Sequence, residues 1–162
     1  MKTKFLTVCM AALLLFTTAC SGSSEPAVDV NINDATQTII DKVEFVDGSA
    51  GFAEVGEAMV ENYYSGISDV AEEYRILING TGAQTDEIAV IKAKSGKASD
   101  VKKLIEERIE RQKTAFTDYG PADARPKLDS PVIETSGDYV IFIIAPDSAN
   151  AKQVAKDILA GK

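Results

Sequence analysis

One short motif places residue types that could do chemistry at a catalytic spacing. Ser99-Asp100-Val101-Lys102 has the Ser-x-x-Lys order in which a lysine deprotonates a serine one helical turn away, as in β-lactamase-type enzymes. The companion Ser-Asp-Asn and Lys-Thr-Gly motifs of those enzymes are missing. Ser99 stands where a helix needs an N-cap, and Asp100 suits the positive end of the helix dipole. The motif therefore predicts a helix start at Ser99 rather than a nucleophile.

A second motif offers oxygen atoms to a cation. Asp29-x-Asn31-x-Asn33 supplies the first three ligands of a calcium loop at alternate positions. The sixth position is Asp34 instead of glycine, and the twelfth is Ile40 instead of glutamate, so both the tight turn and the bidentate ligand are lost. We expect a polar segment that leads into a helix capped by Asp34, and we predict no metal site.

The neighbouring acids Asp86 and Glu87 could in principle share acid and base roles, as in glycosidases. Adjacent residues of a strand point to opposite faces, however, and cannot flank one bond. Gly80-Thr81-Gly82, which precedes them, lacks a following Gly-Lys-Ser/Thr and a helix that could hold a phosphate, so it predicts a turn. We expect Asp86 and Glu87 to be solvated charges at the entry of a strand.

Composition removes most common catalytic centres. The chain has no histidine and two cysteines, Cys9 and Cys20. Histidine is the commonest general base and transition-metal ligand, so Ser-His-Asp, Cys-His and His-rich zinc chemistry are excluded. We expect no enzymatic activity and no cofactor.

The N-terminus predicts export and a lipid anchor. Lys2 and Lys4 precede a largely apolar run of 12 residues from Phe5 to Phe16, which is shorter than the ~20 residues that a membrane-spanning helix needs. The small residues that follow, up to Cys20, resemble the lipobox of bacterial lipoproteins, although Thr17 replaces the usual leucine. In that motif the sulfur receives a diacylglycerol and the cysteine becomes the mature N-terminus. We expect residues 1–19 to be removed and Cys20 to anchor the chain to the extracytoplasmic face of the cell membrane.

Charge limits the partners of the mature chain. Removing residues 1–19 takes away two lysines and no acid, which leaves 15 basic and 25 acidic residues and a net charge of −10. Such a surface repels the phosphates of nucleic acids, so nucleic acid binding is excluded. The small polar residues after Cys20 are typical of a flexible tether over residues 20–34, and residues 35–162 have the length of one domain.

Hydrophobic periodicity predicts an α+β domain. Strands are expected at 74–78, 87–93, 132–135 and 139–145, and long helices from 99 to about 119 and near the C-terminus. Short helices are expected after Asp34 and from Val55 to Gly66, with a loop at 48–51 between them. The strand-turn-strand-helix order occurs twice. It predicts a four-stranded, largely antiparallel sheet from two ββα units, with the two long helices packed on one face. The short N-terminal helices before them are expected to close an edge or the other face.

Tyrosines offer the best candidates for a recognition surface, because tyrosine combines apolar contact with a polar tip. The chain has five tyrosines and no tryptophan. Tyr63, Tyr64 and Tyr119 are expected at helix ends beside loops, where a partner could reach them.

Three segments together carry a resemblance to a known family. They are the strand Asp86–Ala93, the helix that ends in Phe116-x-x-Tyr119, and Gly137-Asp138-Tyr139-Val140. Over residues 35–159 the chain resembles the lipoproteins, mainly of Gram-positive bacteria, grouped as domain of unknown function 4358, although Tyr64–Ser68 departs from the Tyr-Gly-Ile-Asp expected there. The resemblance implies no assigned activity. It suggests an accessory role beside membrane-bound O-acyltransferases that acylate surface polymers.

Three functions remain open from the residues alone. The first is a membrane-anchored module that binds another envelope protein or polymer without catalysis. The second is an extracytoplasmic binding protein for a small ligand, which requires a pocket with a few convergent polar groups. The third is a hydrolase, which would need two acids from separate elements in one cleft.

Overall fold

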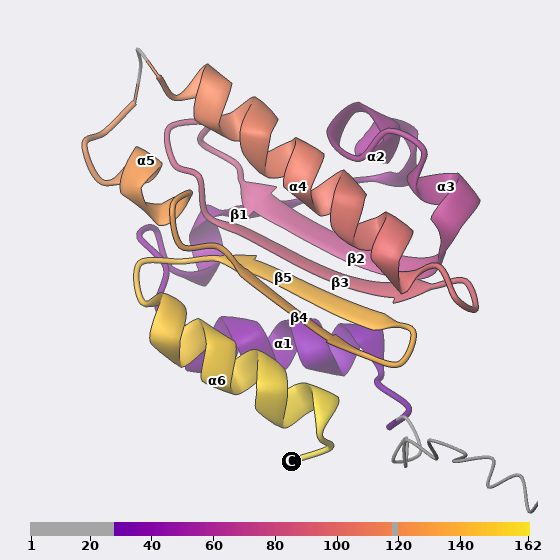
Figure 1. Ribbon diagram of the computed structural model, residues 1–162. Coiled ribbons are helices and arrows are strands. Elements are labelled where there is room, and N and C mark those ends of the chain that lie inside the picture. Colours follow the sequence, from indigo (N-terminus) through magenta and orange to yellow (C-terminus); the bar gives the residue numbers. More distant parts are fainter. Residues whose placement is uncertain (1–27, 118–119) are drawn as a thin grey trace, which may run out of the picture.

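The computed structural model describes residues 28–117 and 120–162 and contains a five-stranded antiparallel sheet (Figure 1). The strand order is β1-β2-β3-β5-β4, so the two central strands, β3 and β5, come from different hairpins. The strands are β1 (Phe52–Glu54), β2 (Ala71–Asn79), β3 (Glu87–Ala93), β4 (Val132–Ser136) and β5 (Tyr139–Ile144).

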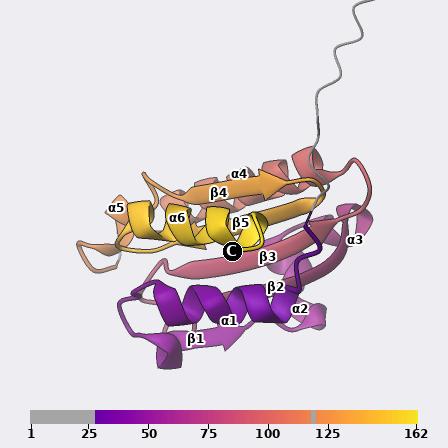
Figure 2. The ribbon, with the colours of Figure 1, turned by 90° about the horizontal axis from the view of Figure 1, so that it is seen from below.

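Helices cover both faces of the sheet. One face carries α1 (Ile32–Lys42) and α6 (Ser148–Leu159), which lie side by side in Figure 2. The other face carries α2 (Glu57–Tyr63), α3 (Ile67–Val70) and α4 (Ala98–Ala115). A short helix, α5 (Ala124–Lys127), follows α4 and leads into β4.

The pattern of side chains on β3 explains why two layers of helices are needed. Ile88 and Val90 belong to the apolar core under α1 and α6, whereas Ala89 and Ile91 belong to the core under α4. Successive residues of a strand point to opposite faces, and all four of these side chains are buried. A strand that is apolar on both sides must be covered on both sides.

The predicted α+β class is confirmed, but two details of the predicted sheet are wrong. A fifth strand, β1, lies between the expected loop at 48–51 and the helix expected from Val55, and it pairs with the end of β2. With three residues it is too short to show alternation, and its pairing with β2 decides its conformation. The two long helices, α4 and α6, also pack on opposite faces rather than on one face, although each follows a β-hairpin.

Two predicted helix caps are also wrong. The side chain of Asn31, not Asp34, accepts hydrogen bonds at the start of α1, from the backbone N–H groups of Asn33 and Asp34 at 3.0 Å. The helix α4 begins at Ala98 after Lys97, so Ser99 lies inside its first turn. It ends at Ala115, earlier than expected.

The helix expected from Val55 to Gly66 is the shorter α2, and a further short helix, α3, begins directly after Gly66. They are separated at Gly66, whose φ of 86° is the left-handed conformation that glycine adopts without a steric cost. The break turns the chain so that Tyr64, which follows α2, packs into the core under α4.

The two ends of the described chain meet at one end of the sheet. A Cβ on Gly161 would lie 3.2 Å from the side chain of Val28. The hydroxyl of Tyr139 donates to Asp29 at 2.7 Å, and Tyr139 pairs with Lys92 at the far end of β3 from Glu87. Within the described residues no helix is long and apolar enough to cross a membrane. The loop between β2 and β3 lies at the opposite end of the sheet (Figure 1).

Candidate functional site

Glu87 is the centre of a buried polar cluster. It is the first residue of β3, its side chain is fully buried, and it faces α4. Its carboxylate accepts hydrogen bonds from the Tyr64 hydroxyl at 2.5 Å and from the Gln112 amide Nε2 at 2.7 Å. Arg108 donates to it twice at short range, from Nη2 at 2.8 Å and from Nε at 3.1 Å. We call Tyr64, Glu87, Arg108 and Gln112 the Glu87 cluster.

Helix geometry brings the two α4 members together. Arg108 and Gln112 are four residues apart, so they lie one above the other on the same face of the helix. The guanidinium of Arg108 also lies 5.0 Å from the ring centroid of Tyr63, in cation–π geometry. One turn of α4 therefore holds the cluster and packs against the end of α2.

Arg111 reinforces the contact between α4 and α2. It donates a hydrogen bond from Nη2 to the backbone carbonyl of Tyr63, which lies near the C-terminal end of α2. Arg111 itself is exposed. Among the described residues it forms no salt bridge, so its charge is the one near the Glu87 cluster without a carboxylate partner.

A second buried ion pair lies one residue away on the chain. Asp86 pairs with Lys127 of α5 at 2.9 Å, and both side chains are almost completely buried. Lys127 Nζ also donates to Gln84 Oε1 at 2.8 Å, and the Thr85 hydroxyl donates to the carbonyl of Ala124 at 2.7 Å. These bonds tie α5 to the end of the β2–β3 loop.

Burial shifts the proton affinities of this region. Desolvation raises the pKa of Tyr64 well above its usual value, and the neighbouring Glu87 raises it further. Desolvation also raises the pKa of Asp86, although Lys127 opposes the shift. Burial alone would lower the pKa of Arg108, but Glu87 more than offsets that effect, so the pKa of Arg108 is raised. Arg108 is therefore a permanent cation.

A small pocket of about 180 Å³ opens between the C-terminal half of α4 and the β2–β3 loop. The pocket is lined by polar side chains from both ion pairs, with apolar residues on its other walls. Its lining residues are Tyr63, Ile78, Asn79, Gly82, Gln84, Asp86, Arg108, Arg111, Gln112, Ala115 and Phe116.

Two buried oxygens of this lining have no hydrogen-bond partner among the described residues: Gln112 Oε1 and Asp86 Oδ2. The backbone amide of Val46 also favours the ionised form of Asp86, so Gln112 Oε1 is the clearer unsatisfied atom. Buried polar atoms are normally satisfied by protein, water or ligand. Gln112 Oε1 has almost no exposed surface, so a ligand in the pocket could not touch it in this arrangement.

Both buried acids of this region are ion-paired. Each buried acid faces its own cation, Arg108 or Lys127. The two acids also belong to adjacent positions of one chain segment, not to separate elements that could flank a bond. In residues 28–117 and 120–162 no group of three or more histidine, cysteine, aspartate or glutamate side chains could hold a metal ion.

The structure separates the three tyrosines predicted to form a recognition surface. Tyr63 is half-buried and lines the pocket. Tyr64 is fully buried in the core and cannot present a surface, because its hydroxyl is satisfied by Glu87. Tyr119 and the predicted lipidation site Cys20 lie outside the described residues.

The prediction of solvated acids at the start of β3 is wrong. Asp86 is 1% exposed and Glu87 is fully buried. The missing information was the pair of cations, which α4 and α5 supply from far along the chain. One signal was present in the sequence: Gln112 and Arg108 interrupt or border the apolar stripe of α4 on its inner face.

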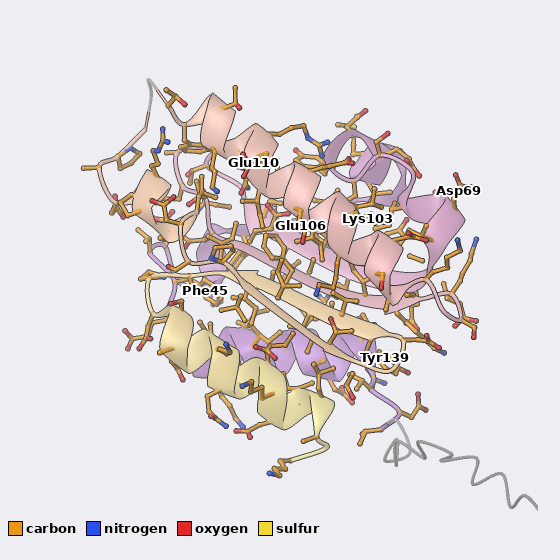
Figure 3. The ribbon with its side chains drawn as sticks, viewed as in Figure 1. Phe45, Asp69, Lys103, Glu106, Glu110 and Tyr139 are labelled. Atoms are coloured by element: carbon orange, nitrogen blue, oxygen red, sulfur yellow. The ribbon has the colours of Figure 1, made fainter. Side chains whose placement is uncertain are left out.

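The outer face of α4 is charged, and the open hollow of about 540 Å³ on it is lined by exposed side chains only. Glu106 and Glu110 are both exposed and lie one turn apart, with Lys103 one turn before Glu106 (Figure 3). Exposed charges at this spacing are typical of a solvated helix face. The buried polar groups of α4 therefore lie on its inner face, beside the pocket.

A family model described as "Domain of unknown function (DUF4358)" matches residues 47–145, which include the Glu87 cluster and the pocket. Searches of curated proteins and of solved structures find no match.

Proposed function

The chain belongs to the family described as "Domain of unknown function (DUF4358)", and we propose that it is a lipid-anchored, non-enzymatic binding module of the cell envelope. Its partner is an envelope protein or polymer that presents a small polar group to the pocket beside Glu87. The family description assigns no activity, so the proposal rests on the site.

The observation that carries the proposal is the pocket itself, whose wall joins the Glu87 cluster to Arg111, a cation without a carboxylate partner among the described residues. The members of the Glu87 cluster are hydrogen-bonded to one another, and such a cluster fixes side-chain positions. Polar groups held in a rigid frame are pre-organised, and pre-organised polar groups give binding sites their specificity.

The anchor in this proposal comes from the N-terminal sequence. Cys20 follows an apolar segment and small residues in the order expected of a bacterial lipoprotein. Two acyl chains hold a protein stably on a membrane, whereas one chain holds it only marginally. The module would then meet its partner at the outer face of the cell membrane.

In-cell crosslinking with a blocked pocket tests the function. Ala115 lines the pocket and is exposed at the end of α4, so Ala115→Trp should fill the pocket without disturbing the Glu87 cluster. Thr114→Trp, at the exposed neighbouring position outside the pocket lining, is the matched control. The tagged, lipidated protein is crosslinked in cells, and captured partners are identified by mass spectrometry.

We expect one dominant envelope partner with the wild type and with Thr114→Trp. Ala115→Trp should lose that partner, and Cys20→Ala should lose it because the chain leaves the membrane. A partner that is retained in full by Ala115→Trp would contradict binding through the pocket.

A further inference from the structure

We propose that the pocket binds one isolated, singly charged oxyanion, that is, a carboxylate or a phosphate diester group. This inference rests on the proposed function, because it names the chemical class of the group that the partner presents. Three observations lead to it: the charge of the wall, the kind of hydrogen-bonding atoms that are open in the wall, and the way in which Arg111 is held.

The wall of the pocket is positive, although the chain as a whole has a net charge of −8. The buried pairs Glu87–Arg108 and Asp86–Lys127 are each neutral in total. The charge of Arg111 is therefore the one left over in the wall. The C-terminal end of α4 can offset about half of one charge at most, so the positive sign remains.

Among the described residues, the carboxylate and amide oxygens of the wall are either engaged or covered. Lys127 donates to Asp86 Oδ1 at 2.9 Å and to Gln84 Oε1 at 2.8 Å. Asn79 Oδ1 accepts from the residue two positions later. Asp86 Oδ2 and Gln112 Oε1 have almost no exposed surface. A ligand that donates hydrogen bonds therefore finds none of these oxygens open.

The open groups of the wall are instead N–H donors. Arg108 donates only Nε and Nη2, both to Glu87, and Arg111 donates only Nη2, to a backbone carbonyl of α2. Gln84 presents its oxygen to Lys127, which can only donate, so its amide NH₂ group is left. In the described part of the chain the remaining N–H groups have no partner. An oxyanion, which only accepts hydrogen bonds, matches them.

Arg111 is held in place although no acid pairs with it among the described residues. Its hydrogen bond to the carbonyl of Tyr63 fixes part of the guanidinium beside the end of α2. The adjacent Glu110 pairs with Lys113 instead. A cation that is fixed and keeps open N–H groups is pre-organised for an anion, and a guanidinium can bind two oxygens of a carboxylate or phosphate at once.

Charge and volume limit the ligand to one group with one charge. One unpaired cation neutralises one negative charge, and the negative chain around it repels a dense polyanion. The pocket volume of about 180 Å³ lies below the ~300 Å³ at which sites for drug-sized ligands begin. Ile78, Ala115 and the ring of Phe116 supply the apolar part of the lining, against which a short alkyl stem can pack.

Nuclear magnetic resonance of the full-length, lipidated chain tests the ligand class. The protein is held in an uncharged glycoside detergent, because phosphocholine detergents carry the proposed group, and the buffer contains no carboxylate or phosphate. The probes are propionate and dimethyl phosphate, with propionamide as the neutral match of propionate. The signals followed are the Nε–H groups of Arg108 and Arg111 and the side-chain amide of Gln84.

Two substitutions on α4 separate the pocket from a general effect of charge. Arg111→Gln removes the unpaired cation, and Lys113→Gln removes a cation two positions along, outside the pocket lining. We expect saturable, millimolar binding of at least one of the two anions. Arg111→Gln should weaken it by about tenfold or more, as expected for hydrogen bonds between charged groups. Lys113→Gln should change it by less than about twofold, because an exposed charge is screened.

The neutral probe and the blocked pocket complete the comparison. Propionamide should bind about tenfold more weakly than propionate. Ala115→Trp should abolish the shifts, and Thr114→Trp should preserve them. Tighter binding of propionate would support a carboxylate on the partner, and tighter binding of dimethyl phosphate would support a phosphate diester.

Three results would overturn the inference: no saturable shift with either anion, equal binding of propionamide and propionate, or equal weakening by Arg111→Gln and Lys113→Gln. The crosslinking experiment separates it from the proposed function. If Ala115→Trp loses the partner while Arg111→Gln keeps it in full, the ligand class is wrong and the binding module stands. If Ala115→Trp also keeps the partner, the proposed function fails, and the inference fails with it.

Discussion

Among single residues at the end of the sheet that holds the pocket, Glu87 is expected to contribute most to the stability of the fold. Replacing Glu87 with glutamine removes the negative charge that neutralises Arg108, whose side chain is 15% exposed. Breaking one partner of a buried ion pair costs about 3–5 kcal/mol, because the other charge stays buried and unpaired. We expect this loss in the free energy of unfolding, measured by urea denaturation.

Glu54→Gln is the matched control for that substitution. Glu54 also pairs with an arginine, Arg75, but the Glu54 side chain is 57% exposed, and pairs at the surface are worth less than about 1 kcal/mol. Equal losses for the two variants would contradict the structural role assigned to the Glu87 cluster.

The raised pKa of Tyr64 predicts how the free energy of unfolding changes at alkaline pH. Its folded-state pKa is raised above the ordinary 10.0 by burial and then by Glu87. The stability that this tyrosine contributes is complete below pH 10.0 and is lost as the pH rises toward its folded pKa, because only the unfolded form ionises. Tyr64→Phe should therefore reduce the alkaline slope of the free energy of unfolding by up to about 1.4 kcal/mol per pH unit.

Denaturant midpoints on either side of pH 10.0, together with tyrosinate absorbance, measure this slope. The variant also loses the hydrogen bond to Glu87, but that loss is independent of pH below the tyrosine pKa. An unchanged alkaline slope would show that Tyr64 ionises normally in the fold.

The sequence did not predict the burial of two individual residues, Asp86 and Glu87. Adjacent acids at a strand start are usually solvated, and nothing local distinguishes Asp86 and Glu87 from such acids. Their burial depends on Lys127, which lies 41 residues away, and on Arg108, 21 residues away. The ion pairs of the site form only through tertiary contacts. Tyr63, which lines the pocket, could be predicted as a recognition residue from its residue type and its expected position at a helix end.

At the scale of elements, the β4–β5 hairpin depends on one glycine. The turn has two residues, Gly137 and Asp138, and Gly137 has a φ of 56°. Asp138 has a negative φ, since no non-glycine residue in the described part of the chain is positive. This combination is the type II′ turn, which matches the twist of the strands.

Gly137→Ala should destabilise the protein by about 1–2 kcal/mol, because alanine pays a steric cost at positive φ. Asp138→Ala, at the neighbouring turn position, loses one exposed hydrogen bond to Gly96 and should cost less than about 1 kcal/mol. Thermal unfolding of both variants checks the order, and a larger loss for Asp138→Ala would argue against the turn assignment.

Most long elements could be predicted from the sequence, since their periodicity is local. The β3 strand matches its predicted range of 87–93 at both ends, and the α4 stripe places Val101, Ile105 and Ile109 in the core as expected. The three-residue strand β1 could not be predicted in this way, because its pairing partner decides its conformation. The side of the sheet covered by each helix likewise depends on the paths of the connections.

For the whole molecule, the proposed anchor makes a separate prediction. Cys20→Ala should move the protein from the membrane fraction to the soluble fraction, because no acyl chains would hold it. Cys9→Ala, within the predicted signal segment, should leave it in the membrane fraction. Fractionation and immunoblotting measure the distribution, and a Cys20→Ala protein that stays with the membrane would contradict a lipid anchor on this residue.

The opposite positions of Val28 and the pocket have a consequence for avidity. With Cys20 as the anchor, at most about 28 Å of chain separates the lipid from Val28, and the pocket faces away from that end of the sheet. A polymer fixed to the same envelope would meet the pocket at the high effective concentration of two tethered partners, which reaches the millimolar range for short linkers. Under such confinement even a weak site would be occupied for a substantial part of the time, while it exchanges quickly enough to let the polymer slide past.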